Sequence, residues 1–330
     1  MKAKSKRPHV RLEWKNWRSR RLLAGAGLAV AAFLAGNLVS RALAATDVVN
    51  ACQQTATDVL AGCRGSAQSD YQIALGKCVN VSDQAARKAC QKQAAEDLDD
   101  ALQTCKGGFG VREESCDKLG PAPYDPVIDP ANFVAKIDNP FFPLVPGTTF
   151  IYKGQTSEGL MRDEFAVTHN TRVIDGVTCV EVHDSVFTDG ELTEDTLDWF
   201  AQDKDGNVWY FGENTAELED GLISTIDGTF MAGVDGDKPG IVMKAHPAVG
   251  DFYRQEFSLG NAEDEAETLD LNASVTVPYG SFQHCLKSEE TTPLEPDALE
   301  DKFYAPGVGN VLTVDVETGE RCELVQIITE

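Results

Sequence analysis

Six cysteines placed symmetrically about one midpoint constrain this chain more than any other feature. They are Cys52, Cys63, Cys78, Cys90, Cys105 and Cys116. The gaps between them are 11, 15, 12, 15 and 11 residues. Steps of 11 and 15 residues are close to three and four helical turns, so three cysteines stay near one face of each helix. The pattern predicts two antiparallel helices joined by nested disulfides.

The symmetry favours one disulfide pairing among those that six cysteines allow. The predicted bonds are Cys52–Cys116, Cys63–Cys105 and Cys78–Cys90. An alternative pairs Cys52 with Cys78 and Cys90 with Cys116, because both pairs are 26 residues apart. Both schemes contain Cys63–Cys105, which is therefore the firmest of the predicted bonds.

The composition around these cysteines is helical. Residues Gln84 to Thr104 are rich in Ala, Leu, Gln, Glu and Lys, and Ser82 is the expected N-cap. We expect Gly62, Gly65 and the GGFG run at 107–110 to interrupt the helices and to weaken the outer disulfide most. A hairpin with so small a core needs its disulfides, so their role is structural rather than redox or metal-binding.

Residues 1–44 have the features of an export signal. They carry ten basic residues and one acidic residue, and Arg20-Arg21 precedes an apolar run that leads to Ala42-Leu43-Ala44. The paired arginines are typical of a twin-arginine signal. We expect cleavage after Ala44 and a periplasmic or extracellular protein. The alternative is an uncleaved N-terminal anchor, because the apolar run is close to membrane-spanning length.

The rest of the chain divides at a proline-rich segment. The cysteine-rich region spans 45–118, a linker spans 119–132, and 133–330 is an acidic domain. From Pro121 onward 41 acidic residues face 11 basic ones, a net charge of −30. Such a surface repels nucleic acids and anionic lipids, so neither is an expected partner. It attracts cations or basic partners, or keeps the protein soluble.

Residues 133–330 read as short alternating runs separated by Gly, Pro, Asn and Asp, including TTFIYKG, VTCVEVHDSVF, SVTVPYG and CELVQII. This pattern predicts a mainly antiparallel sandwich or open barrel, and hence an α+β chain. The domain has three further cysteines, Cys179, Cys285 and Cys322, which leaves an odd thiol unless one pairs between chains.

Several motifs in this domain resemble those of one family. They are NPFFPLVPGTTFIYKG, DWFAQDKDGNVWYFGE, AGVDGDKPGIVM, VPYGSF, TPLEPD and KFYAPGVGNV. The set is similar to a widespread group of exported, functionally uncharacterised bacterial β-proteins, over about 139–330 and excluding the helices. The resemblance implies an architecture similar to the curved sheets of periplasmic lipoprotein carriers. It implies no reaction.

Catalytic signatures are missing from the sequence. The exported part has four histidines, at 169, 183, 246 and 284, and their sequence neighbours Asp184 and Cys285 point to the opposite strand face. No G-x-S-x-G, H-E-x-x-H, P-loop or G-x-G-x-x-G occurs. We therefore expect a protein that is not an enzyme. A carboxylate pair acting on a sugar is the least implausible exception.

Asp205-Gly206 lies between two aromatic runs and predicts a two-residue type I′ hairpin turn. That register places Phe200 opposite Phe211, Ala201 opposite Tyr210 and Gln202 opposite Trp209. Large apolar side chains then occupy both faces, so we expect the strand pair to be covered on both sides. The cover would be the helical cap or a bound ligand.

The same register places Asp198 opposite Glu213, and solvent at a strand end is the simplest way to relieve their repulsion. A calcium loop is excluded there, since Gly and Glu fall at the wrong positions. A cation site built from distant acids stays open, with Asp198, Glu213, Asp235 and Asp237 as its candidate ligands. No other cofactor is expected.

The sequence thus favours an exported binding protein whose β domain takes a small apolar or cationic ligand or an envelope partner. The aromatic residues expected to hold the ligand are Trp199, Trp209, Tyr210 and Tyr253. Two alternatives remain, a divalent-cation binding protein and a purely structural or interaction module.

Overall fold

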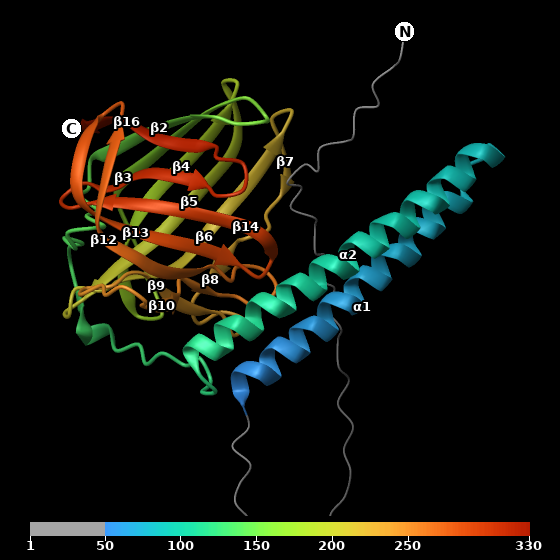
Figure 1. The fold of residues 1–330 in the computed structure, drawn as a ribbon, viewed down its shortest axis with the longest axis horizontal. Helices are drawn as coiled ribbons and strands as arrows, with labels where there is room; N and C mark the ends of the chain where they lie inside the picture. The colour runs from blue at the N-terminus through green and yellow to red at the C-terminus, as the bar shows by residue number, and fades with distance from the viewer. Residues whose placement is uncertain (1–49) are drawn as a thin grey trace, which may run out of the picture.

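The computed structural model describes residues 50–330. The predicted export signal, residues 1–44 with its cleavage site after Ala44, lies outside the described residues. Two helices come first, followed by a large antiparallel sheet that curves into a nearly closed barrel (Figure 1). The α+β prediction is confirmed, and of the two predicted β architectures the barrel is the one that forms. None of the described helices is long and apolar enough to span a membrane.

The helices α1 (Ala51–Val79) and α2 (Gln84–Leu119) form the predicted antiparallel hairpin. Disulfides join Cys52 to Cys116, Cys63 to Cys105 and Cys78 to Cys90, with Cα–Cα distances of 5.6, 5.8 and 5.6 Å. All three predicted bonds are therefore confirmed. The N-cap of α2 is Asp83, whose carboxylate accepts from the Ala86 amide, so the prediction of Ser82 was wrong by one residue.

The glycines do not break the helices, contrary to the prediction. At Gly62 and Gly65 an added Cβ would meet nothing within 4 Å, and the disulfides hold both helices through this region. Gly107 and Gly108 have a different reason to be small. An added Cβ on Gly108 would lie 2.1 Å from the carbonyl oxygen of Pro293. These glycines allow α2 to approach the barrel closely.

The barrel wall is one antiparallel sheet. Its path runs β10-β12-β13-β14-β15-β16-β2-β3-β4-β5-β6-β9-β11, and β1, β7 and β8 pair beside it. The strands are β1 (Phe133–Val134), β2 (Thr148–Gln155), β3 (Leu160–Ile174), β4 (Val177–Thr188), β5 (Glu191–Asp203), β6 (Val208–Glu219), β7 (Leu222–Thr225), β8 (Phe230–Met231), β9 (Lys238–Met243), β10 (Phe252–Arg254), β11 (Glu256–Phe257), β12 (Glu265–Val277), β13 (Gly280–Thr292), β14 (Glu295–Ala305), β15 (Gly309–Asp315) and β16 (Arg321–Thr329).

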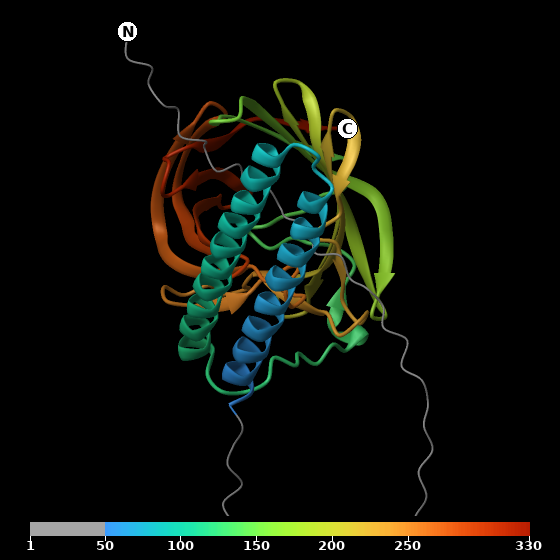
Figure 2. The ribbon, with the colours of Figure 1, turned by 90° about the vertical axis from the view of Figure 1, so that its right-hand side faces the viewer.

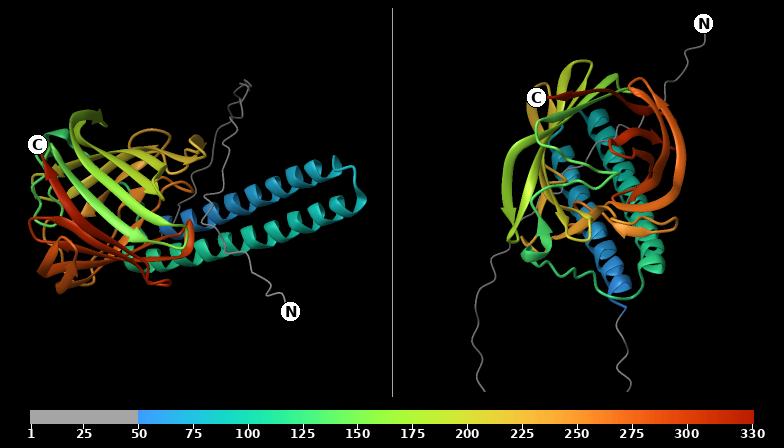
Figure 3. Two further views of the ribbon diagram at one scale, coloured as in Figure 1. Left: turned by 90° about the horizontal axis from the view of Figure 1, so that it is seen from above. Right: turned by 90° about the vertical axis from the view of Figure 1, so that its left-hand side faces the viewer.

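Residues 252–257 bridge the two ends of this path. Arg254 belongs to β10, which pairs with β12, whereas Glu256 begins β11, which pairs with β9. Gly240 permits the close approach here, since an added Cβ would lie 2.2 Å from the Gln255 carbonyl oxygen. The view through the barrel in Figure 3 shows the resulting curved wall around an interior.

The helical hairpin lies across one end of the barrel (Figure 2). The contact is polar and lies on the C-terminal half of α2. Arg112 donates two hydrogen bonds to Glu263, at 2.9 and 2.5 Å, and both side chains are buried. Ser115 contacts Glu265, and Lys118 lies 2.5 Å from Glu267. Residues 112, 115 and 118 share one helix face, so a single face of α2 binds the barrel.

Between α2 and the sheet, the chain forms a short 3-10 helix, η1 (Pro130–Asn132), and pairs β1 with β5. Phe133 then packs edge-on against Trp209 and Phe211. These rings belong to an apolar cluster outside the barrel wall, where Ile128 and Phe133 cover β5 and β6. The predicted cover on both faces therefore exists. On the outer face it comes from the linker region, neither the helical cap nor a ligand.

The hairpin between β5 and β6 has a longer turn than predicted. The Asp203 amide donates to the Asn207 carbonyl, so residues 204–206 form a three-residue loop. Gly206 has a φ of +100°, and Asp205 is not in the left-handed region, which excludes a type I′ turn. The Asp203 carboxylate accepts from Gly206, Asn207 and the Trp209 indole, and these bonds favour the longer loop.

The register between β5 and β6 therefore differs from the prediction near the turn and agrees with it further along the strands. Phe200 lies opposite Tyr210 and Ala201 opposite Trp209, one residue from the prediction. A bulge at Phe211 then takes up the extra residue. Beyond it Asp198 lies opposite Glu213, as predicted.

The three cysteines of the barrel are free thiols. Cys179 lies on β4, Cys285 on β13 and Cys322 on β16, and none of these strands is adjacent to another. No disulfide forms among these three cysteines. Burial raises the pKa of the Cys179 thiol to about 12, so it holds its proton and resists oxidation.

Candidate functional site

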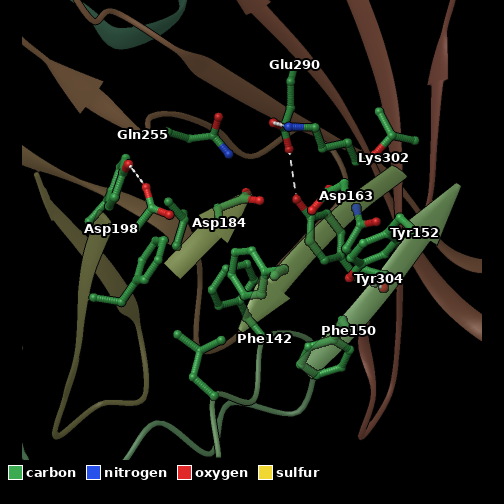
Figure 4. Close-up of a pocket in the computed structure, with 18 of the residues that line it drawn as sticks. Phe142, Phe150, Tyr152, Asp163, Asp184, Asp198, Gln255, Glu290, Lys302 and Tyr304 are labelled. Carbon is green, nitrogen blue, oxygen red and sulfur yellow. Dashed lines mark hydrogen bonds and ion pairs between the residues drawn. The ribbon is translucent and has the colours of Figure 1, made fainter. Parts of the chain in front are cut away.

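A cavity of about 270 Å³ lies inside the barrel (Figure 4). Aromatic rings and carboxyl groups dominate its lining. The aromatic residues are Phe142, Phe150, Tyr152, Phe165, Phe200, Tyr210 and Tyr304. The charged residues are Asp163, Asp184, Asp198, Glu256, Asp264, Glu290 and Lys302. Six acids therefore share the cavity with one basic side chain.

Three of the acids form a row across neighbouring strands, which we call the acidic row: Asp163 on β3, Asp184 on β4 and Asp198 on β5. Asp184 pairs with Phe165, two residues from Asp163, and Asp198 pairs with Val182, two residues from Asp184. Residues two apart share a strand face. All three carboxyls consequently point into the barrel, as Figure 4 shows.

The first two members of the row raise or oppose one another's ionisation. Burial raises the pKa of Asp163 to about 6, while a hydrogen bond with Asp184 opposes the shift. Burial, and then the charge of Asp163, raise the pKa of Asp184 well above its usual range. The Oδ1 atom of each is buried without a hydrogen-bond donor from the protein. Two adjacent carboxyls cannot both ionise cheaply, so Asp184 holds the proton.

Asp198 extends the row to β6 through a tyrosine. The Tyr210 hydroxyl lies 2.5 Å from Asp198 Oδ1 and 3.0 Å from Glu213 Oε2. A phenol has one proton to donate. It serves Asp198, whose Oδ1 is the nearer acceptor, so Glu213 accepts the weaker of the two bonds. Burial and the charge of Asp198 raise the pKa of Glu213 well above its usual range.

Burial also raises the pKa of Asp198 to about 7, although the hydrogen bond from Tyr210 opposes the shift. The expectation that solvent relieves the Asp198–Glu213 pair was wrong, since only 6% of Asp198 is exposed. Their repulsion is removed by protonation because both lie inside the wall rather than at a strand end.

The opposite wall contains the single lysine. Lys302 Nζ lies 2.8 Å from Glu290 Oε2 and 3.5 Å from Glu300. Burial alone would lower the pKa of Lys302, but Glu290 and Glu300 raise it well above its usual value. The Tyr304 hydroxyl donates to the other oxygen of Glu290 at 3.0 Å. The lysine charge is thus engaged by these two carboxylates.

Two more acids come from the segment that closes the barrel. Burial raises the pKa of Asp264 to about 6, and the charge of Lys302 opposes this. Burial, followed by the charge of Asp264, raises the pKa of Glu256 well above its usual range. Carboxyls with raised pKa values therefore occupy both walls, and the cavity carries protons that a bound cation could displace.

The NPFFPL and YAPGVG motifs meet at one end of the cavity. The Gly307 amide donates to the Pro140 carbonyl at 2.6 Å. Asn139 holds the loop by donating to the carbonyls of Gly206 and Lys244. The loop places the Phe142 ring 5.5 Å from that of Phe200, beside the acidic row.

The predicted ligand residues separate on the two sides of the wall. Of the four, Tyr210 lines the cavity. Trp199 and Trp209 belong to the outer face, where Trp199 packs in the cluster under Phe133. Tyr253 is buried in β10 and is not part of the cavity lining. The tryptophans face outward because the bulge at Phe211 and the alternation along β5 place Phe200 and Tyr210 inside.

The predicted metal residues also separate. Asp198 and Glu213 meet through Tyr210, whereas Asp235 lies in an exposed turn with a φ of +53° and Asp237 follows it. Within residues 50–330 no group of three or more His, Cys, Asp or Glu side chains has a metal-binding arrangement. The four residues do not form one site.

One outer-surface cluster has the composition of a catalytic triad without its geometry. His183 Nε2 lies 2.6 Å from Asp195 Oδ1 and 3.3 Å from Ser185 Oγ. In a working triad the acid and the hydroxyl contact different ring nitrogens. Here both contact the same nitrogen, so the imidazole cannot pass a proton between them in this arrangement.

Most residues of the cavity were not predicted from the sequence, among them Asp163, Asp184, Glu290 and Lys302. A signal for the acidic row was present. Asp163 alternates in phase with Phe165 and Val167, so it must share their core-facing side. An ionisable residue in phase with core positions indicates a buried charge, and therefore a candidate site.

No family model matches this chain, and no curated protein matches it. Among solved structures, it is similar to one described as "a putative lipoprotein from Parabacteroides distasonis ATCC 8503". The two share 15% identity with a TM-score of 0.32, over 57% of this chain and 98% of that one. A similarity at this level does not assign the chain to a family. The resemblance to exported β-proteins stays a prediction.

Proposed function

We propose that this protein is an exported, non-enzymatic binding protein whose barrel cavity holds a small ligand. The observation that carries the proposal is the cavity itself, which has a volume of about 270 Å³ and seven aromatic side chains in its lining. Small-molecule sites are usually concave and combine aromatic side chains with convergent polar groups, as this lining does.

Export is supported by the three disulfides of the helical hairpin. Disulfides persist in oxidising compartments and are rare in the cytosol. The N-terminal signal predicted from the sequence agrees with this location. The three barrel thiols do not oppose it, because Cys179 and Cys285 are fully buried.

Native mass spectrometry of protein purified from its own host tests the binding proposal. We expect a bound small molecule that is lost from a Val242→Trp variant, because Val242 lines the cavity and a larger side chain fills it. Val173→Trp is the control, since Val173 is 67% exposed and is not part of the cavity lining. A clean apo mass for the unmodified protein would contradict the proposal.

A divalent-cation site is the second candidate, favoured by the six cavity acids. Its test is thermal unfolding in millimolar calcium and then in chelator. Calcium binding to the native state raises the unfolding midpoint. An unchanged midpoint would exclude this candidate.

A further inference from the structure

The charge balance of the cavity restricts its ligand. An anionic ligand such as a fatty acid would meet six carboxyls and one lysine that Glu290 and Glu300 already engage. A neutral apolar ligand would leave the two buried, unpartnered oxygens of Asp163 and Asp184 without donors. Unmet buried acceptors cost free energy, so a complementary ligand supplies donors or positive charge to them.

The aromatic rings around the acidic row also favour a positively charged ligand. Phe165 lies on the same strand face as Asp163 and opposite Asp184, and Phe142, Phe200 and Tyr210 pack beside Asp198. Ring faces attract cations, most strongly where water is excluded. Carboxyl groups and aromatic rings that line the same cavity therefore suit a ligand that has both a positive charge and apolar groups.

We propose that the cavity binds an organic ammonium ion, whose positive charge displaces protons from the acidic row and whose apolar groups lie against the surrounding rings. This inference rests on the proposed function, because it names the ligand class of the same cavity. It also sets a pH dependence, since each displaced proton must leave the protein.

The titratable groups that face the acidic row come from strands on both walls of the cavity. Tyr152 comes from β2, Glu194 from β5, Tyr210 and Glu213 from β6, and Cys322 from β16. Burial raises the pKa of each of these five groups. Glu256, Asp264, Glu290 and Lys302 face it from the opposite wall, and His183 from behind β4.

The pKa values of the acidic row set the direction in which ligand affinity changes with pH. The pKa values of Asp163 and Asp198, raised by burial to about 6 and about 7, leave both partly protonated in that range. A cation beside them favours the ionised form and releases protons. Binding therefore strengthens as pH rises, by about tenfold per pH unit for each proton released below the pKa.

Choline and its neutral isostere 3,3-dimethylbutan-1-ol form a matched pair of probes. Isothermal titration calorimetry of each is carried out between pH 5 and pH 8. At pH 7 the titration is repeated in two buffers of different ionisation enthalpy, which counts released protons. We expect choline to bind, with proton release and weaker binding at pH 5, and the alcohol to bind at least about tenfold more weakly.

The variant Asp163→Asn/Asp184→Asn should lose roughly tenfold or more in choline affinity. Glu164→Gln is the control, because Glu164 follows Asp163 on the same strand and contacts Arg162 on the outer face. If the double variant does not fold, the number of protons that the unmodified protein releases on binding choline still tests the inference.

The outcomes separate the two proposals. Equal binding of choline and the alcohol, without proton release, would overturn the ammonium inference and leave a cavity for neutral ligands. Binding of calcium but not choline would overturn it in favour of an inorganic cation. An apo mass by native mass spectrometry together with no binding of either probe would contradict the proposed function as well.

Discussion

The pKa values of the three carboxyl groups in the acidic row are set mainly by burial and not by pairing with basic residues. Burial is the leading cause of the raised pKa values at Asp163, Asp184 and Asp198. Such groups favour the folded state only while they are protonated. Below about pH 4 both folded and unfolded chains hold these protons, and between about pH 4 and 7 only the folded chain does.

The free energy of unfolding contributed by these groups is therefore largest at acid pH and falls as pH rises through the folded-state pKa values. For Asp198, with a pKa of about 7, the loss between pH 4 and 8 is roughly 2–4 kcal/mol. We expect the variant Asp198→Asn to reduce the decline by this amount, because the amide cannot ionise. Urea unfolding at pH 4 and pH 8 measures it.

Glu191→Gln is the matched control, since Glu191 is exposed at the start of the same strand. It should leave the pH dependence unchanged. If both variants showed the same pH dependence as the unmodified protein, Asp198 would not be protonated in the folded state.

At the scale of elements, glycine has two different roles in α2. Gly108 lies against the β13–β14 turn, where Pro293 leaves no space for a Cβ. Gly110, one half-turn further along, has nothing within 4 Å of an added Cβ. A side chain added at Gly108 therefore meets a backbone atom. A side chain added at Gly110 meets nothing and only removes the unfavourable helix propensity of glycine.

We expect Gly108→Ala to destabilise the protein by about 1–3 kcal/mol, because α2 must move away from the barrel. Gly110→Ala should stabilise it by about 0.5–1 kcal/mol. Urea unfolding measured on both variants tests the pair. Equal effects of the two changes would mean that α2 does not rest on the turn in solution.

At the scale of the whole molecule, one buried ion pair joins the hairpin to the barrel. Glu263 is 0% exposed and accepts from Arg112 and from the Gly260 amide. The Lys118–Glu267 pair nearby is partly exposed. A buried charge that loses its partner costs far more than an exposed one, so the two pairs differ in importance.

Arg112→Met should therefore weaken docking by about 3–5 kcal/mol, and Lys118→Met by less than about 1 kcal/mol. Limited proteolysis between residues 120 and 129 reports docking, because this segment crosses from α2 to the barrel. We expect faster cleavage in the first variant and recovery in Arg112→Met/Glu263→Gln. Unchanged cleavage in Arg112→Met would show that other contacts hold the hairpin.

Much of the secondary structure and the disulfide pattern of this protein could be predicted from local periodicity in the sequence. The cysteine spacing predicts the helical hairpin and favours the three disulfides that form over one alternative pairing, because helix geometry repeats over neighbouring residues. Alternation along a strand also fixes which face a residue takes, so Asp163 could be assigned to the core side with Phe165. The glycine prediction failed because the contact that keeps Gly108 small comes from Pro293.

Only the tertiary structure decided which residues meet. A period of two gives the face of a strand but not its neighbours, and here the C-terminal β16 pairs with β2, near the start of the barrel. That closure places Lys302 and Glu290 across the cavity from Asp163. The single-residue bulge at Phe211 likewise turned Trp209 outward and Tyr210 inward. Strand pairing between segments far apart in sequence, together with burial, converts scattered acids into one cavity.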